Sequence, residues 1–336
     1  MAINWETDLI VPQSVLDAIR TLSAQRSPFF SSGVAVLEEI DAFGRGGNFV
    51  KRKYSAEDSV HGTRITGDEQ VPSRLGAHAD VAPVLRRLRL RTFIDGEGAA
   101  EGGIMSEDPS GRILQQTISW WTRETDEVLL ACLAGAFGAG GCLEATHLHD
   151  VTGSGVAPGK LTYSGVMDAA ARLGDAAADL ALVVMHSRQY LDVVKEAGAR
   201  ASSLPVGSEP FLTETFVGPY KVVVSDAVPV EGTAGEADAI YTAVLCGPGT
   251  FWSGVQQDIR EFGGWNARVP RFELSQTRHF TAALAGLSAS SAMPVNPTNE
   301  QLATVGNWEP TVSLATEAGR KSVRVVGIKS GASPAA

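Results

Sequence analysis

The stretch DPSGRILQQTISWWTRETDEVLLACLAGAFG, from Asp108 to Gly138, decides the fold because it predicts one helix much longer than any other element. Asp108 is of a type that caps helix starts, and Pro109 suits the first turn, where no amide donor is needed. Gly138 is typical of a helix end. The expected buried stripe recurs at steps of three and four residues, at Leu114, Ile118, Trp121, Thr125, Val128, Leu129, Cys132, Leu133 and Ala136. At about 1.5 Å per residue the helix would be about 45 Å long, so we expect it to join several sub-structures.

The composition is that of a globular chain, with length for one elaborate domain or two ordinary ones. The chain has 336 residues, 44% of them hydrophobic, and no run approaches the roughly 20 apolar residues of a membrane span. The start MAINWETDLIVPQ lacks the features of a secretory signal, so we expect the protein to act where it is made. The cysteines Cys132, Cys142 and Cys246 lack metal-ligand spacing and indicate buried thiols in a reducing cytoplasm. The formal charge of -10 argues against binding to nucleic acid through phosphate neutralisation.

Residues 1–46 read as an N-terminal arm. They contain one modest amphipathic stretch, from Pro12 to Leu22, and end in a glycine-rich segment. The arm is too short to bury its own apolar side chains. We therefore expect Phe29, Phe30, Leu37 and Ile40 to find partners elsewhere.

Residues 47–95 read as a long two-stranded ribbon. NFVKRKYS, which begins at Asn48, and VLRRLRLRTF, which begins at Val84, both alternate in the manner of strands. The polar stretch VHGTRITGDEQVPSRLGAHAD between them would form the tip. A lone ribbon buries too little apolar surface to be stable in water, so it needs a surface to lie on.

Basic side chains are striped along this ribbon in an otherwise acidic protein, at Lys51, Arg52, Lys53, Arg86, Arg87, Arg89 and Arg91. We predict that they form a subunit interface with an acidic face of another copy. Charge reversal at Arg87 and Arg89 would then reduce assembly and leave the monomer folded. The alternative is a solvated hairpin with local ion pairs to Glu57, Asp58, Asp68 and Glu69.

The second half of the chain predicts an α/β region. We expect helices at 163–180 and 187–199, and buried or alternating strands at 181–186, 218–230 and 239–247. Residues 251–263 read as a short helix or a loop, residues 270–290 as a strand, and residues 322–328 as a last strand.

Two sequence motifs resemble ligand sites, and both fail on inspection. GSGVAPGK, at residues 153–160, has Ser154 where a P-loop needs glycine, and Leu161 where it needs Ser or Thr. His147, His149 and Asp150 could hold a metal, but no further Cys or His cluster accompanies them, and a polar loop is favoured. We therefore predict no cofactor and no metal site.

No set of residues predicts catalysis. The chain has no Gly-x-Ser-x-Gly elbow that would present a nucleophilic serine. His186 closes a strand and precedes a helix, where catalytic residues do occur in α/β sheets. A residue in that place more often caps the following helix. An arm and a ribbon that cannot stabilise themselves, without catalytic residues, favour an assembly subunit over an enzyme.

The order of these segments resembles the major capsid proteins of tailed bacteriophages, the HK97-like fold family. Three stretches carry the resemblance. LVVMHSRQYLDVVKEAG, with Met185, His186 and Tyr190, is similar to the family's strand and turn into a helix in the axial domain. GPYKVVVSDAVPV is similar to a later axial strand and its polar turn, and RFELSQTRHFTAALAG to the strand that returns to the long helix. The matching positions in the first of these two stretches are Gly218, Val222, Val223 and Asp226. In the second they are Arg278, His279 and Phe280.

The resemblance implies an α+β, HK97-like capsid fold with five parts. These are an arm (1–46), an extended β-ribbon loop (47–95), a peripheral domain (96–160) with its spine helix at 108–137, an axial α/β domain (161–248), and a last part (249–336) that holds the returning peripheral strands and a C-terminal tail. The tail beyond Met293 has no expected placement.

The resemblance also implies a function and partners. Copies would form the hexamers and pentamers of an icosahedral virion shell around double-stranded DNA, without sequence-specific contacts and without a membrane. A portal would complete the shell, with scaffolding and decoration proteins as further possible partners. Little sequence precedes the arm, which implies a separate scaffold or none. The protein would be made in the bacterial cytoplasm.

Two other readings remain open from the residues. One is a soluble α/β enzyme with a crevice between residues 140 and 250 and an unidentified small-molecule substrate. The other is an encapsulin-like cargo nanocompartment shell with the same fold, which would form small closed shells without DNA.

Overall fold

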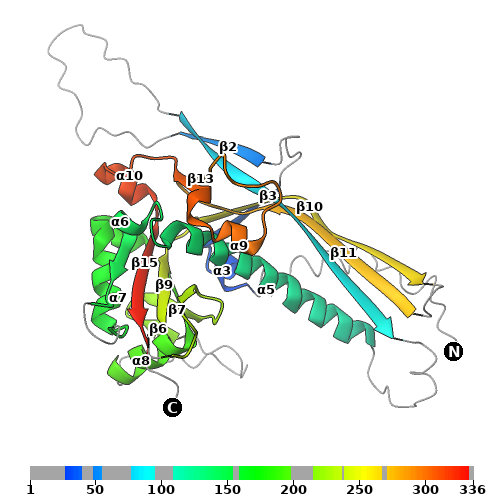
Figure 1. Ribbon diagram of the computed structural model, residues 1–336, viewed down its shortest axis with the longest axis horizontal. Helices are drawn as coiled ribbons and strands as arrows, with labels where there is room; N and C mark the ends of the chain where they lie inside the picture. Colours follow the sequence, from blue (N-terminus) through cyan, green and yellow to red (C-terminus); the bar gives the residue numbers. More distant parts are fainter. Residues whose placement is uncertain are drawn as a thin grey trace, which may run out of the picture.

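The computed structural model describes residues 27–39, 48–54, 77–94, 109–153, 159–197, 215–236, 238–266 and 271–332. A long helix connects a sheet of extended strands with a second, mixed α/β layer (Figure 1). Three expected features lie outside the described residues: the amphipathic stretch Pro12–Leu22, most of the ribbon tip, and the helix cap at Asp108.

Helix α5 (Pro109–Phe137) confirms the long helix predicted from the sequence. It begins at the expected proline and ends at the residue before Gly138, whose amide still donates to the carbonyl of Ala134. The stripe from Ile118 onward is buried along its whole length, with at most 4% exposure at Ile118, Trp121, Thr125, Val128, Leu129, Cys132, Leu133 and Ala136. The spacing of three and four residues is therefore the core-facing side of this helix.

The first sheet packs over α5 and has the strand order β1-β10-β11-β3-β2, with β12 also paired to β10. Its strands are β1 (Ala35–Glu39), β2 (Asn48–Tyr54), β3 (Ala77–Ile94), β10 (Phe251–Asn266), β11 (Arg271–Thr281) and β12 (Ala283–Leu284). Only β1 runs parallel to its neighbour. The short helix α3 (Pro28–Ser31) precedes β1 and places Phe29 edge-on to Phe251, with ring centres 5.5 Å apart.

The expectation for residues 251–263 was wrong, since they belong to the long strand β10. The pairing of β10 with β11 shifts register between Val255 and Gln257 and again between Gln257 and Arg260. Each irregularity breaks the alternation of inward and outward side chains. A search for a period of two therefore misses the strand.

The ribbon pairs differently from the prediction. Strand β2 pairs antiparallel with residues 77–83, part of which the sequence assigned to the irregular tip. Residues 84–94 of β3 pair instead with β11, from Val84 opposite Thr281 to Ile94 opposite Arg271. The VLRRLRLRTF pattern thus marks a strand, as predicted, but its partner comes from the far end of the chain.

The second sheet has the strand order β4-β15-β9-β5-β7-β6, with β8 paired to β9. Its strands are β4 (Leu148–Asp150), β5 (Leu182–Met185), β6 (Thr215–Val217), β7 (Tyr220–Val224), β8 (Val230–Glu231), β9 (Ile240–Cys246) and β15 (Val325–Gly331). The accompanying helices are α6 (Glu144–His147), α7 (Tyr163–Ala170), the 3-10 helix η1 (Ala171–Asp179) and α8 (Ser187–Ala197). The single helix expected at 163–180 is broken at Gly174, which has φ +60°.

The second sheet takes strands from outside residues 161–248, the range that we expect for an axial domain. Strand β15, from the predicted last part of the chain, lies between β4 and β9, and β4 itself precedes residue 161. All but one residue of β15 are buried, as expected for a strand covered on both faces. Because strand partners far apart in sequence leave no local signal, the position of this tail in the sheet could not be predicted.

Most of the rest of the C-terminal part packs on α5 and on the first sheet. It contains β13 (Leu287–Ala289), α9 (Asn299–Leu302), η3 (Val305–Asn307), β14 (Trp308–Pro310) and α10 (Glu317–Ser322). Its last helix, α10, packs instead against η1. A side chain at Gly135 of α5 would collide with the carbonyl oxygen of Leu302 and with the ring of Trp308. Glycine at this position lets the tail approach the helix closely.

Candidate functional site

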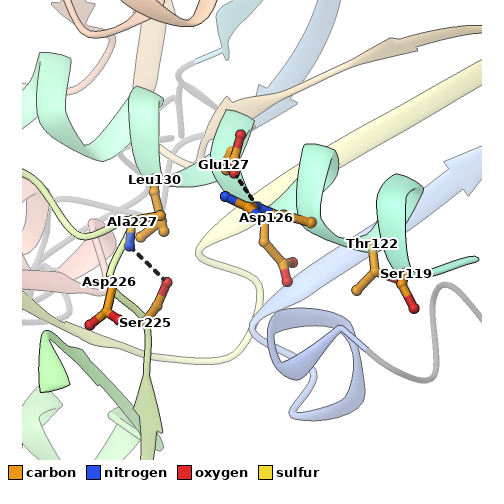
Figure 2. Close-up of a pocket in the computed structure, with 9 residues that line it drawn as sticks. Ser119, Thr122, Asp126, Glu127, Leu130, Ser225, Asp226 and Ala227 are labelled. Carbon is orange, nitrogen blue, oxygen red and sulfur yellow. Dashed lines mark hydrogen bonds and ion pairs between the residues drawn. The ribbon is translucent and has the colours of Figure 1, made fainter. Parts of the chain in front are cut away.

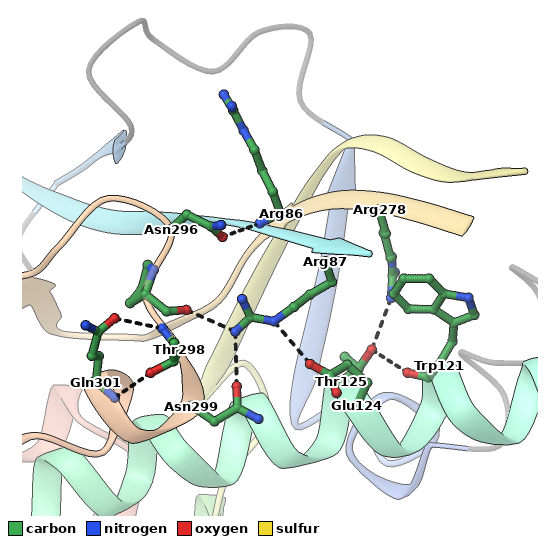
Figure 3. Close-up of polar contacts among 11 residues, drawn as sticks. Arg86, Arg87, Trp121, Glu124, Thr125, Arg278, Asn296, Thr298, Asn299 and Gln301 are labelled. Atoms are coloured by element: carbon green, nitrogen blue, oxygen red, sulfur yellow. Dashed lines mark hydrogen bonds and ion pairs between the residues drawn. The ribbon is translucent and has the colours of Figure 1, made fainter. Parts of the chain in front are cut away.

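Arg87 joins three parts of the chain where β3 passes over α5 (Figure 3). Its Nε lies 3.1 Å from Oε1 of Glu124 on α5. Its Nη2 donates to the carbonyl oxygen of Pro297 and to Oδ1 of Asn299, both at 3.0 Å. A guanidinium suits this site because its planar donors can satisfy several acceptors at once.

Arg89 and Arg278 lie on the same inner face of the sheet and are also buried. The guanidinium of Arg89 stacks 5.0 Å from the ring centre of Trp120 and donates to Gln276. Arg278 donates to Thr125 of α5 at 3.0 Å. Side chains alternate between the two faces of a strand, so every second side chain of β3 points toward α5. Arg87 and Arg89 lie on the same face of β3 as the buried Leu85.

The predicted interface residues therefore divide into groups. Arg87 and Arg89 contact other residues of their own chain, so reversal of their charges is now expected to destabilise the monomer, contrary to the prediction made from the sequence. Arg86 has the opposite parity on β3 and is exposed. The side chains of Lys51, Arg52, Lys53 and Arg91 lie outside the described set, so their role as an interface stays a prediction.

A cleft of about 790 Å³ lies between α5 and the turn that follows β7 (Figure 2). Its walls are Ser119, Thr122, Arg123, Asp126, Glu127 and Leu130 of α5, with Ser225, Asp226 and Ala227 of the turn. Arg123 is paired with Glu127, Nε to Oε1 2.7 Å, and this partner raises its pKa.

Asp126 anchors the start of the described chain at this cleft. Its Oδ1 accepts a hydrogen bond from the Ser27 hydroxyl at 2.6 Å. Burial raises the pKa of Asp126 to about 7, the Ser27 bond opposes that shift, and the neighbouring charge of Glu127 adds to it. The carboxyl group is thus protonated at acidic and near-neutral pH.

His186 caps helix α8, as favoured from the sequence. Its ring Nδ1 accepts from the amide of Arg188, and its own amide donates to Oε1 of Gln189. Its Nε2 lies 3.5 Å from Asp226. Desolvation lowers the pKa of His186 although Asp226 opposes the shift, so the ring is neutral near pH 7.

The HLHD cluster is not the polar loop that the sequence favoured. His147 ends α6, and residues 148–150 form β4. His147 is fully buried, with Nε2 3.0 Å from the carbonyl oxygen of Arg320, and burial lowers its pKa. Across the part of the chain that the structure describes, no three His, Cys, Asp or Glu side chains gather as metal ligands would.

Cys132 and Cys246 are buried thiols and Cys142 is partly buried, and none has the lowered pKa of a reactive thiol. Burial raises the pKa of Cys132 to about 12 and that of Cys142 to about 11, and it raises the pKa of Cys246 as well. A thiol with a raised pKa is a poor nucleophile. Within the described helices, none is long and apolar enough to cross a bilayer.

Comparison with known proteins gives consistent matches. A family model described as "Major capsid protein 13-like" matches residues 119–241. The major capsid protein of Bacillus phage SPP1 is 26% identical over 320 residues, which span 92% of this chain and 94% of that protein. The chain is similar to a phage major capsid protein over nearly its whole length.

The fold agrees with solved capsids. The capsid of Ralstonia phage GP4 superposes with a TM-score of 0.62 at 10% identity, covering 91% of this chain and 89% of that chain. The capsid of Helicobacter pylori bacteriophage KHP30 superposes with a TM-score of 0.56 at 10% identity, covering 91% of this chain and 92% of that chain. The chain therefore has the α+β, HK97-like fold of these capsids.

The structure brings together two of the stretches that carried the resemblance to capsid proteins. His186 and Asp226 meet at adjacent ends of the parallel strands β5 and β7. Arg278 and Phe280 instead belong to β11, under which α5 passes. Sequence reasoning missed the contacts of Ser27 with Asp126 and of Arg87 with Pro297, since each joins segments far apart in the chain.

Proposed function

We propose that this chain is the major capsid protein of a tailed phage and that it builds the icosahedral virion shell as hexamers and pentamers that enclose double-stranded DNA. A portal would occupy one vertex, and scaffolding and decoration proteins are further candidate partners. The protein would be made in the bacterial cytoplasm and act by packing rather than by catalysis. The observation that carries this proposal is the sequence match to one curated capsid protein across nearly all of both chains.

The physical character of the chain supports the proposal. In the described residues, β2 pairs only with the first part of β3, at the edge of the first sheet. A two-stranded extension of this kind gains little stability alone and is completed by a neighbouring surface. Many such contacts, each modest, add up in a closed symmetric shell.

Within this proposal the chain keeps the five predicted parts with two changes. The axial part of the molecule takes in β4 and β15, and the extended loop is paired at residues 48–54 and 77–83. Lys51, Arg52, Lys53, Arg86 and Arg91 remain proposed subunit-interface residues. The acidic balance of the chain, -10 in formal charge, would keep packaged DNA from adhering to the inner wall.

Expression of the chain alone and with candidate scaffolding proteins, followed by gradient sedimentation and negative-stain electron microscopy, tests the proposal. We expect closed shells or rings of five and six copies. Stable monomers or dimers that gain thermal stability with a small-molecule ligand would overturn it in favour of an enzyme. Shells in infected cells that hold protein cargo and no DNA would overturn it in favour of a nanocompartment.

A further inference from the structure

Besides β2, which ends the strand order, the first sheet has two further stretches of edge that the described residues leave uncovered by any strand. One edge is β1, which pairs only with β10. The other edge is the second part of β3, residues 84–94, because β2 reaches no further than Pro83. An uncovered strand presents a row of backbone donors and acceptors that can template another strand.

The β1 edge is partly apolar on both faces. The Phe251 amide donates to the carbonyl oxygen of Val34, so Val34 faces β10 with its backbone. Backbone direction alternates along a strand, and the N–H and C=O groups of Ala35, Leu37 and Glu39 therefore point away from β10. Val36 and Leu37 are consecutive and so point to opposite faces, yet they are 41% and 43% exposed. Both faces of this edge thus offer apolar surface to a partner.

The β3 edge is satisfied by a side chain at one position. The Arg86 amide donates to Oδ1 of Asn296 at 2.7 Å, so Arg86 faces the open side, and Leu88, Leu90 and Thr92 follow by alternation (Figure 3). Asn296 has φ +53°, a conformation that residues other than glycine rarely adopt. Leu88 is 65% exposed next to this contact.

The two edges are complementary in charge as well as in polarity. Strand β1 reads AVLEE and ends in Glu38 and Glu39, whereas residues 86–92 of β3 read RRLRLRT. Arg86 is exposed on that side, although Arg87 and Arg89 turn inward. The apolar β1 edge ends in two glutamates, and the apolar stretch of the β3 edge follows the exposed basic side chain of Arg86. Edges of this kind on opposite sides of one sheet suit a head-to-tail contact between identical copies.

We propose that β1 of one copy adds to residues 88–92 of β3 in the next copy, so that the sheet continues across the subunit boundary. The main chain supplies the affinity in such a pairing, and the exposed side chains select the register. Five residues on each side match in length. A head-to-tail contact of this kind closes into a ring when its rotation permits, and the proposal rests on the ring assembly proposed above.

Hydrogen–deuterium exchange of the unmodified protein, compared between dissociated subunits and purified particles, tests this pairing. Amides of Leu37, Glu39, Leu88 and Leu90 are expected to exchange about tenfold more slowly in particles, because pairing protects them. Equal rates in the two states would overturn the proposal. Amides at the exposed face of α8, around Leu191, serve as the internal reference.

Cross-linking identifies the partner edge. In particles of the double variant Leu37→Cys with Leu88→Cys, a short bismaleimide is expected to give a ladder of covalent dimers up to rings. The matched control is Leu191→Cys with Leu88→Cys, because Leu191 is 52% exposed on α8 and away from both edges. A ladder only in the control, or in neither protein, would overturn the pairing.

The two proposals fail in different ways. If particles form but the edges stay unprotected, the edge pairing is wrong and the capsid function stands. If no particles form under any condition, the assembly proposal itself fails. The variant Leu88→Asp, which should fold because this side chain is exposed, is expected to lower particle yield at least tenfold relative to Leu191→Asp. Equal yields would contradict the pairing.

Discussion

Arg87 on β3 and Glu124 on α5 form an ion pair, Nε to Oε1 3.1 Å, with side-chain exposures of only 15% and 18%. The same guanidinium holds Pro297 and Asn299 of the C-terminal part. One side chain thus joins the long strand, the spine helix and the returning tail. Its role is to fix the fold of the subunit.

Replacement of Arg87 should therefore affect the monomer before it affects assembly. Arg87→Ala leaves Glu124 and two further acceptors without their donor, and we expect the free energy of unfolding to fall by about 2–3 kcal/mol. Arg86→Ala is the matched control, since Arg86 is exposed, and should change it by less than about 0.5 kcal/mol. Urea denaturation of the dissociated subunit measures both. Equally small losses of unfolding free energy in Arg87→Ala and Arg86→Ala would show that the contacts of Arg87 with Glu124, Pro297 and Asn299 add no stability.

Close approach of the tail to α5 depends on Gly135. The added methyl group in Gly135→Ala would meet the Leu302 carbonyl and the Trp308 ring. We expect a loss of about 1–3 kcal/mol, because helix and tail must separate. Gly306→Ala has nothing within 4 Å of the new carbon and is the control. The midpoint of thermal unfolding is measured for both variants. A Gly135→Ala protein as stable as the Gly306→Ala protein would show that the tail does not pack closely on α5 at this position.

Asp126 should make subunit stability depend on pH. Its folded pKa of about 7 lies above the ordinary value for aspartate, so the folded state holds a proton that the unfolded chain releases between about pH 4 and pH 7. Unfolding free energy therefore falls as pH rises through this window, by about 2–4 kcal/mol at most.

Asp126→Asn removes this titration and keeps an oxygen that accepts from Ser27. The variant should show a flatter pH profile between pH 4 and pH 8 and should exceed the unmodified protein in stability at pH 8. Asp175→Asn, at an exposed carboxylate paired with Lys321, is the control at another site. Parallel profiles for Asp126→Asn and the unmodified protein would mean that Asp126 is ionised in the folded state.

Gln189 ties helix α8 to the second sheet. Its side chain is fully buried, accepts from the His186 amide, and donates to the carbonyl of Tyr241 and to the hydroxyl of Ser330. Gln189→Leu should lower unfolding free energy by about 2–4 kcal/mol, since buried polar groups lose their partners. Leu191→Ala on the exposed side of α8 is the control, and denaturant midpoints compare the two. A similar midpoint for both variants would contradict this link to β15.

The sequence predicted elements whose signals are local. The stripe from Ile118 to Ala136 repeats over five turns with a capping start and a glycine end, so the spine helix could be placed closely. His186 was favoured as a cap because helix starts have short-range rules. The strand β5, with all four residues buried, likewise read as a buried run.

Features that depend on distant partners could not be placed in this way. Nothing near Val325 shows that β15 will enter the second sheet between β4 and β9. The alternation around Arg87 fixed which side chains share a face, but not that this face lies against α5. The register shifts in β10 hid a long strand. Tertiary pairing decided each of these outcomes.

The central claim is that this subunit is completed by identical neighbours, and cryo-electron microscopy of purified particles tests it most directly. We predict a closed icosahedral shell in which residues 48–54 and 77–83 of one copy contact an adjacent copy. A monomer in solution, with these residues folded onto its own body and no particles formed, would contradict the account.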